Sequence, residues 1–177
     1  MVATRRRFAL RPVVALAFAG TLCGCASSVR GAAERTPPSG RASRSQGPAV
    51  VALEQQVHEA VNAHRRARGL PILEFEARIA RQARLHSDAM ATGTIPLGHD
   101  GFAARVEALR QAMPCRRTAE NVAFNRGHSD PGAEAVRGWI ASRSHRRNIE
   151  GPYELTGVGI ARNARGEIYF TQLFVGQ

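Results

Sequence analysis

The chain has 177 residues, of which 44% are hydrophobic, so it can form one ordinary domain with an apolar core. Its formal net charge of +11 comes from arginine, because none of the 25 basic residues is a lysine. Eight of these arginines lie in the first 49 residues, and the others are mixed with acidic residues without interleaved aromatics, which argues against nucleic-acid binding.

Residues 1–24 have the features of a cleavable signal peptide. A positively charged segment at residues 4–11 precedes an apolar stretch at residues 12–21 that is too short to span a bilayer. The segment closes on Leu22-Cys23-Gly24-Cys25, which resembles a lipobox. Cys25 would then be lipidated and become the first residue of the mature protein. The alternative is a plain secretory leader cleaved nearby, and both interpretations predict export.

The leader also bears on the export route and on the membrane in which the protein would be anchored. Residues 4–8 also resemble the twin-arginine pattern, so the general and twin-arginine routes both remain open. Ala26 follows the lipidated cysteine, and in a Gram-negative cell alanine at this position favours the outer membrane, facing the periplasm. The sequence thus predicts an exported protein anchored to a membrane.

A tether is predicted between the anchor and the domain. Residues 25–49 are rich in Ser, Gly, Pro and Arg and show no apolar period, so ordering them would not bury enough apolar surface to offset the lost chain entropy. The pattern changes at Val50, and residues 50–177 are predicted to form the single folded domain.

Three helices are predicted in the first part of this domain. Apolar residues recur at helical spacing from Val50, and Gly69-Leu70-Pro71 ends the segment. The same spacing predicts a second helix over residues 74–92, with Phe75 on its apolar stripe, and a short third helix from Phe102 that Pro114 terminates.

The second half of the domain alternates a helix with strands. Residues 119–125 predict a short strand, and Asp130-Pro131 predict the start of a helix that runs to about Arg143. Two apolar runs, 157–161 and 167–175, are joined by a segment typical of a β-hairpin. The expected class is α+β, with helices packed on a small antiparallel sheet.

Three further side chains are assigned to packing. His86 falls on the apolar stripe of the second helix and is predicted to be a hydrogen-bonded core histidine, and Trp139 is predicted to be core. Cys115 is the last cysteine of the mature domain, so no intrachain disulfide is expected. It is either an inert buried thiol or a partner for another chain.

Several segments resemble the CAP superfamily of cysteine-rich secretory proteins, antigens and pathogenesis-related proteins, in its bacterial branch. The resemblance covers about residues 57–174 and rests on the order and spacing of short pieces. These pieces are Val61-Asn-Ala-His-Arg65, Ala83-Arg-Leu-His-Ser-Asp-Ala-Met90, His99, Ala119-Glu-Asn-Val-Ala123, Trp139-Ile-Ala-Ser-Arg-Ser-His-Arg-Arg-Asn-Ile149, Gly157-Val-Gly-Ile160 and Tyr169-Phe-Thr-Gln-Leu-Phe174. The resemblance implies an α-β-α sandwich.

The resemblance also implies a cleft whose floor carries two His and two Glu in eukaryotic members. His99, Glu120 and His145 match three of these positions, and Ser142 replaces the second Glu. The predicted ligand-binding cleft therefore comprises these four residues with Asn121. Arg143 and Ser144 stand where bacterial members usually have Pro-Gly, so the turn that presents His145 is expected to differ.

Two interpretations of this cleft remain open at this point. His99, His145 and Glu120 would suffice to bind Zn²⁺, or another divalent cation, with one position open for chemistry. Alternatively, Glu120 accepts hydrogen bonds from His99 or His145 and fixes the surrounding loops. No cofactor is required by the sequence itself.

Three functions are compatible with these features. The leading interpretation is a membrane-anchored, non-catalytic binding module whose cleft takes a small-molecule or lipid ligand. The second is a metal-assisted hydrolase of peptide or cell-wall material, with Glu120 as general base and Asn121 as oxyanion donor. The third is a structural envelope protein. The common HExxH, CxxC and G-x-S-x-G enzyme motifs are absent from the sequence.

Overall fold

The computed structural model describes residues 47–177. The predicted signal peptide at 1–24, Cys25 and most of the tether at 25–49 lie outside the described residues. Within residues 47–177, no helix combines the length and apolar character needed to cross a membrane.

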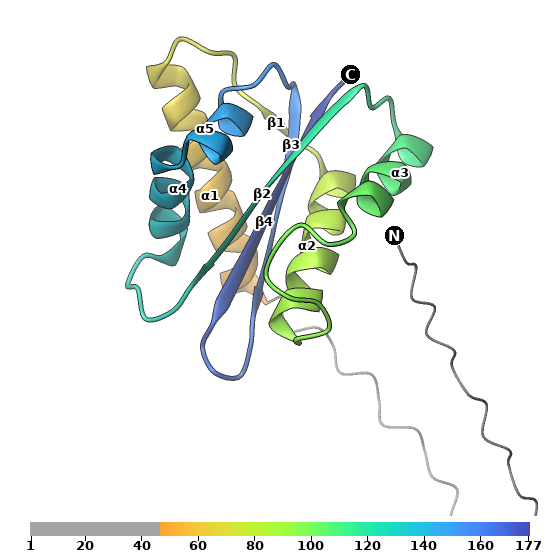
Figure 1. Ribbon diagram of the computed structural model, residues 1–177. Coiled ribbons are helices and arrows are strands. Elements are labelled where there is room, and N and C mark those ends of the chain that lie inside the picture. The colour runs from red at the N-terminus through yellow and green to blue at the C-terminus, as the bar shows by residue number, and fades with distance from the viewer. Residues whose placement is uncertain (1–46) are drawn as a thin grey trace, which may run out of the picture. The chain divides into compact units, whose positions relative to one another are not determined.

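The described residues form two layers of helices with a sheet between them (Figure 1). In chain order the elements are α1 (Pro48–Ala67), β1 (Glu74–Phe75), α2 (Ala77–Ala91), α3 (Phe102–Ala112), β2 (Arg117–Asn125), α4 (Pro131–Ala141), α5 (Arg143–Ile149), β3 (Leu155–Arg162) and β4 (Ile168–Gly176). Helices α1, α4 and α5 cover one face of the sheet, and α2 and α3 cover the other. The predicted α+β class and sandwich are confirmed.

The sheet has the strand order β1-β3-β4-β2. Strands β3 and β4 form the predicted antiparallel hairpin, and β2 pairs antiparallel with β4. Strand β1 instead pairs parallel to β3, with Glu74 opposite Leu155 and Phe75 opposite Thr156, so the sheet is mixed. Because β2 has no strand on its outer side, this edge is open to the helices and loops that build the candidate site.

The assignment of residues 74 and 75 to the second helix is wrong. Glu76 has an extended backbone and its carboxylate accepts a 3.0 Å hydrogen bond from the N–H of Arg78, so it caps a helix that begins at Ala77. Phe75 lies in β1 and is 43% exposed. Phe75 keeps the apolar spacing of the helix by coincidence. The start of α2 is set instead by the capping residue Glu76.

Two apolar clusters hold the layers together. One lies between the sheet and α1, α4 and α5 and contains Trp139, whose predicted core position is confirmed by its exposure of 1%. The other lies under α2 and α3, where Cys115 packs half-buried against it. Burial raises the pKa of the Cys115 thiol, which favours its unreactive form.

Helix α2 lies directly against β3 at two glycines. A Cβ atom on Gly157 would lie 2.1 Å from the backbone N of Ala80, and one on Gly159 would lie 2.0 Å from that of Arg84. Neither separation is sterically possible, so only glycine permits this approach.

The single helix predicted to run to Arg143 is divided in the structure. Ser142 is extended, with ψ of 123°, and ends α4. Its carbonyl then accepts a hydrogen bond from the N–H of Arg146 as α5 begins. The break turns the chain so that His145 lies at the edge of β2 rather than further along α4.

Candidate functional site

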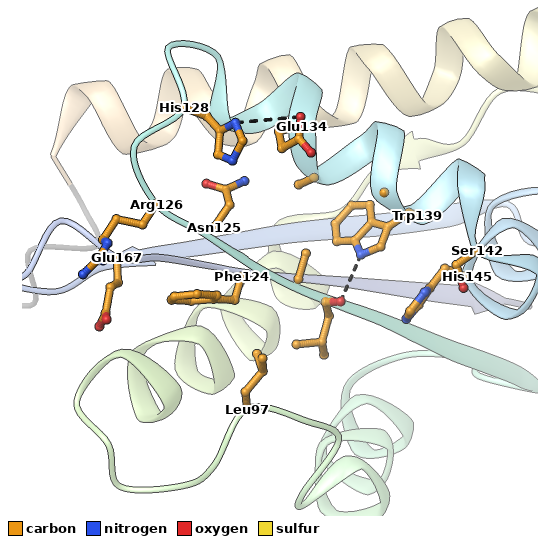
Figure 2. Close-up of a pocket in the computed structure, with 14 residues that line it drawn as sticks. Leu97, Phe124, Asn125, Arg126, His128, Glu134, Trp139, Ser142, His145 and Glu167 are labelled. Atoms are coloured by element: carbon orange, nitrogen blue, oxygen red, sulfur yellow. Dashed lines mark hydrogen bonds and ion pairs between the residues drawn. The ribbon is translucent and has the colours of Figure 1, made fainter.

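A cavity of about 750 Å³ runs along the open edge of β2 (Figure 2). The loop before α3, the loop after β2, α4, α5 and the turn before β4 all contribute side chains to it. The lining residues are Leu97, Val122, Ala123, Phe124, Asn125, Arg126, His128, Glu134, Ala135, Gly138, Trp139, Ser142, His145 and Glu167.

One wall is a single face of α4. Gly138 and Trp139 follow Ala135 by three and four residues, which places them near the same side of the helix, and Ser142 lines the cavity just after the helix ends. The indole N–H of Trp139 donates a 3.0 Å hydrogen bond to the carbonyl of Val122, so the ring is fixed against the edge of β2. A side chain at Gly138 would meet no atom within 4 Å, because it would point into the open cavity.

The opposite wall is apolar and open to solvent. Leu97 is 54% exposed and Phe124 is 43% exposed, and both line the cavity. The Phe124 ring packs against Tyr169 with 5.1 Å between ring centroids. Large apolar side chains left exposed beside a concave surface are typical of a binding groove. The sequence analysis missed both, although Phe124 in a predicted strand was a usable signal.

The outer end of the cavity carries charged residues that the sequence analysis also missed. His128 lies 3.9 Å from Glu134, and Arg126 and Glu167 line the same end. Basic and acidic side chains are both present at this end of the cavity. It therefore offers hydrogen-bonding groups to a ligand without favouring either an anion or a cation. These residues follow β2 or precede β4, and only the pairing of the two strands brings them together.

Glu120 and His99 form a second group of predicted site residues, and neither lines the cavity. The Nδ1 of His99 lies 2.9 Å from Oε1 of Glu120, so the predicted pair is brought together. Glu120 is nearly fully buried, whereas the His99 side chain is 54% exposed. The imidazole therefore presents its second nitrogen to the outside while the carboxylate lies behind it.

Arg105 of α3 is a third member of this group. Its Nε donates to Oε2 of Glu120 at 2.9 Å and its Nη2 donates to Oε1 at 2.8 Å, which makes a bidentate ion pair. Another of its nitrogens donates to the carbonyl of Asp100 at 2.7 Å and fixes the loop that carries His99. Nothing in the spacing of the third helix distinguished Arg105 from an exposed arginine.

Helix α5 carries His145 and is held to β2 by side-chain hydrogen bonds. The Asn121 amide donates to the carbonyl of His145 at 3.1 Å, and the Asn148 amide donates to the carbonyl of Glu120 at 3.2 Å. His145 lines the cavity together with Ser142. Burial, and secondarily the charge of His99, lower the pKa of His145, so the two imidazoles are close enough to interact.

Of the five predicted cleft residues, only Ser142 and His145 line the cavity, and Asn121 lies on the opposite face of β2 from Glu120. It follows Glu120 in β2, so its side chain points to the opposite face of the sheet, and it is fully buried. Its amide accepts a 2.9 Å hydrogen bond from Asn148 and donates to α5. As placed, it holds α5 against β2 and lies away from the cavity.

The geometry does not fit the predicted metal ligands. Both oxygens of Glu120 already accept hydrogen bonds from Arg105, and a guanidinium at this distance repels a cation. Within residues 47–177, no group of three His, Cys, Asp or Glu side chains is gathered closely enough to hold a metal ion. Any metal at His99 and His145 would therefore lack a carboxylate ligand.

His86 lies beneath this group and differs from its prediction in one respect. It is buried, with 2% exposure, as expected. Neither ring nitrogen has a hydrogen-bond partner in the described part of the chain, so the predicted hydrogen bond is wrong. Burial, with added effects of the charges on Arg105 and His99, lowers its pKa to about 4. The ring is therefore neutral at physiological pH.

The profile of the cysteine-rich secretory protein (CAP) family matches residues 58–174, which begin within α1 and end within β4. The chain belongs to the CAP family. This confirms the resemblance inferred from the short sequence pieces, and it means that the cleft described above is part of a CAP domain.

Similar bacterial proteins are known. The CAP chain is 30% identical over 131 residues to the protein YkwD of Bacillus subtilis strain 168, covering 72% of this chain and 49% of the relative, so it spans about half that relative's length. An extracellular SCP-domain protein from Bacillus anthracis superposes with a TM-score of 0.60 at 28% identity, over 72% of this chain and 41% of that one. An outer surface protein from Borrelia burgdorferi shares the fold, with a TM-score of 0.62 at 15% identity, over 71% and 93%.

Proposed function

We propose that this CAP domain is a non-catalytic binding module, exported from the cytoplasm and held at a membrane by a lipid on Cys25. Its cleft takes an amphiphilic small molecule. The cavity along β2 carries the proposal, because its apolar walls and polar ends match a ligand with an apolar body. Export agrees with the extracellular and outer-surface descriptions of the Bacillus anthracis and Borrelia burgdorferi proteins.

The state of Glu120 favours binding over hydrolysis. A general base needs a carboxylate oxygen that can reach a water molecule and accept its proton. Both Glu120 oxygens accept from Arg105, and the side chain is 2% exposed. Asn121, the other residue considered for hydrolysis, has its amide engaged with α5. These contacts support a positioning role for both residues.

The cleft can be tested through the protein's single tryptophan. Trp139 lies in the wall of the cavity, so a ligand that enters should change its fluorescence. We expect dodecyl maltoside, added below its micellar concentration, to produce a saturable change. Gly138→Leu should abolish that change, because the leucine side chain would fill the open space beside Trp139.

Ala141→Leu is the matched control. It adds the same side chain to the exposed end of α4, outside the cavity lining, and should leave the fluorescence titration unchanged. Equal titrations for Gly138→Leu and the unchanged protein would contradict binding in this cavity. The absence of a saturable response to any amphiphile would contradict the proposed function.

A further inference from the structure

Strand β2 directs part of its backbone away from the sheet. It is the last strand of the sheet, and it pairs with β4 one residue to one from Arg117 to Asn125. In an antiparallel ladder, successive residues direct their N–H and C=O groups alternately toward the partner strand and away from it. Every second residue of β2 therefore presents its backbone groups to the space outside the sheet.

Two side-chain contacts identify these outward-facing residues. The indole N–H of Trp139 donates to the carbonyl of Val122, and the Asn148 amide donates to the carbonyl of Glu120. Since Glu120 and Val122 face outward, Phe124 does so as well. Outside the ladder, no hydrogen bond between residues 47–177 involves the N–H of Val122 or the N–H and C=O of Phe124. This stretch of the edge therefore has backbone groups available for a partner.

The cavity wraps around this stretch of the edge. Val122 and Phe124 direct their side chains to one face of the sheet. Ala123 and Asn125 direct theirs to the other face. All four nevertheless line the cavity. Leu97 lies on one side of the strand and α4 on the other, as Figure 2 shows. The space is bounded on both sides of the strand edge, which is the shape that an additional strand would occupy.

The lining beside this stretch suits an uncharged ligand segment. Leu97 is apolar, and Ala135 and Gly138 on the α4 side are small. A Cβ atom on Gly138 would meet no atom within 4 Å, so a side chain of the ligand has room there. The acidic residues Glu134 and Glu167 lie at the outer end, where each is already paired with an arginine. A charged residue beside Leu97 would lose its hydration without gaining a partner.

We propose that the edge of β2 at Val122 and Phe124 binds an extended, uncharged peptide segment of another protein by strand addition. A peptide backbone presents C=O and N–H groups at strand spacing, so it can pair with all three free groups of the edge. Its side chains alternate between the Leu97 side and the Gly138 side. This inference goes beyond the proposed function, because it assigns a second class of ligand to the same cavity.

The test adds the peptide acetyl-Thr-Val-Thr-Val-Thr-amide to the unchanged protein. Its residues are uncharged and favour extended structure. NMR-detected hydrogen exchange reports the amides of Val122 and Phe124, and Trp139 fluorescence reports the affinity. We expect saturating peptide to slow exchange of both amides by roughly tenfold or more, because a bonded amide exchanges only when the contact opens. The amide of Ala123 already faces β4 and should keep its rate.

The matched control is the same peptide with a methyl group on every backbone nitrogen. It keeps the side chains, but it has no backbone N–H to donate and its methyl groups hold it away from β2. We expect it to bind roughly tenfold more weakly, as the loss of one or two hydrogen bonds predicts. This control needs no change to the protein, so it does not depend on the folding of a variant.

A pair of variants tests the same contact from the protein's side. Phe124→Pro removes an outward-facing N–H, a change that an edge strand tolerates. Phe124→Leu keeps that N–H and shortens the apolar side chain in a similar way. Phe124→Pro should therefore weaken peptide binding more than Phe124→Leu does. Equal weakening by the two variants would contradict a backbone contact at this residue.

Four further outcomes separate this inference from the proposed function. Equal affinities of the two peptides would overturn strand addition. Binding of dodecyl maltoside without binding of the peptide would overturn this inference alone. Binding of the peptide without binding of any amphiphile would support this inference and overturn the amphiphile cleft. Amides of Val122 and Phe124 that become protected with rising protein concentration alone would place a second copy at the edge and overturn the inference.

Discussion

The carboxylate of Glu54 on α1 accepts a hydrogen bond of 3.1 Å from the backbone N–H of Ile160 in β3. Strand β1 is two residues long and pairs only with the beginning of β3, so the rest of that edge lacks a strand partner. The buried Glu54 carboxylate takes the place of a strand partner at this edge. Arg84 of α2 fixes that carboxylate by donating hydrogen bonds of 2.5 to 3.1 Å to it. This contact ties both helical layers to one strand.

Glu54→Gln is therefore expected to lower the free energy of unfolding by about 3 kcal/mol, because it leaves Arg84 without its counter-charge in a partly buried position. Chemical denaturation measures this loss. Glu59→Gln, at an exposed position on the same helix, should change stability by less than about 0.5 kcal/mol. Similar effects of the two substitutions would contradict the role assigned to Glu54.

Two glycine substitutions should have opposite effects on stability. Gly159→Ala places a Cβ 2.0 Å from the backbone N of Arg84, so α2 must move, at a cost of about 3 kcal/mol or more. Gly138→Ala adds a methyl group in open space within α4 and should raise stability by about 1 kcal/mol through helix propensity. Thermal melts of the two variants compare them directly, and a stable Gly159→Ala would contradict the close contact of α2 with β3.

Burial of His86 predicts a loss of stability in mild acid. Its pKa is about 4 in the folded protein against 6.5 in an unfolded chain, so the unfolded state binds a proton more readily. The effect is absent above about pH 6.5 and grows to about 3 kcal/mol as the pH falls to about 4. His58 and His145, whose pKa values are also lowered by burial, act in the same direction.

His86→Leu should reduce this pH dependence and raise stability, because it also removes two buried nitrogens without partners. Urea denaturation at about pH 7 and pH 5 provides the measurement. Glutamates with lowered pKa values, such as Glu76 at about 2, lose their contribution only below about pH 4.5 and fall outside this window. If the free energy of unfolding of His86→Leu depends on pH as strongly as that of the unchanged protein, His86 does not cause this pH dependence.

The contacts of Glu120 predict that His99 and His145 do not form a specific zinc site. Calorimetric titration with Zn²⁺ should give the same weak response before and after His99→Ala/His145→Ala, because Arg105 occupies the carboxylate that would complete the ligand set. Micromolar binding that disappears in the double variant would show that Arg105 yields to the metal. The metal interpretation of the cleft would then be supported.

The lipid anchor predicts incorporation of labelled palmitate at one cysteine. Cys25→Ala should abolish labelling and release the protein from the membrane fraction, because the sulfur that carries the lipid is lost. Cys23→Ala and Cys115→Ala remove the other two thiols and should leave labelling unchanged. Label retained in Cys25→Ala would indicate another lipidated residue, whereas no label in the unchanged protein would indicate a plain secretory leader.

Much of the fold could be predicted because it depends on local chemistry. The apolar spacing of α1 around Val57 and Val61, the Asp130-Pro131 start of α4 and the turn before Glu167 all express preferences of neighbouring residues. Errors arose at α2 and α4, where the extended backbones of Glu76 and Ser142 interrupt a continuing apolar pattern.

The sequence by itself determined the α+β class and the CAP family, since motif order and periodicity survive without coordinates. Only the tertiary structure decided how the predicted site residues are arranged and which other residues surround them. Arg105 reaches Glu120 from α3, and Leu97 and Phe124 form a wall only after β2 becomes the sheet edge. Charge balance and cavity shape depend on distances between segments far apart in the chain, and no local pattern encodes those distances.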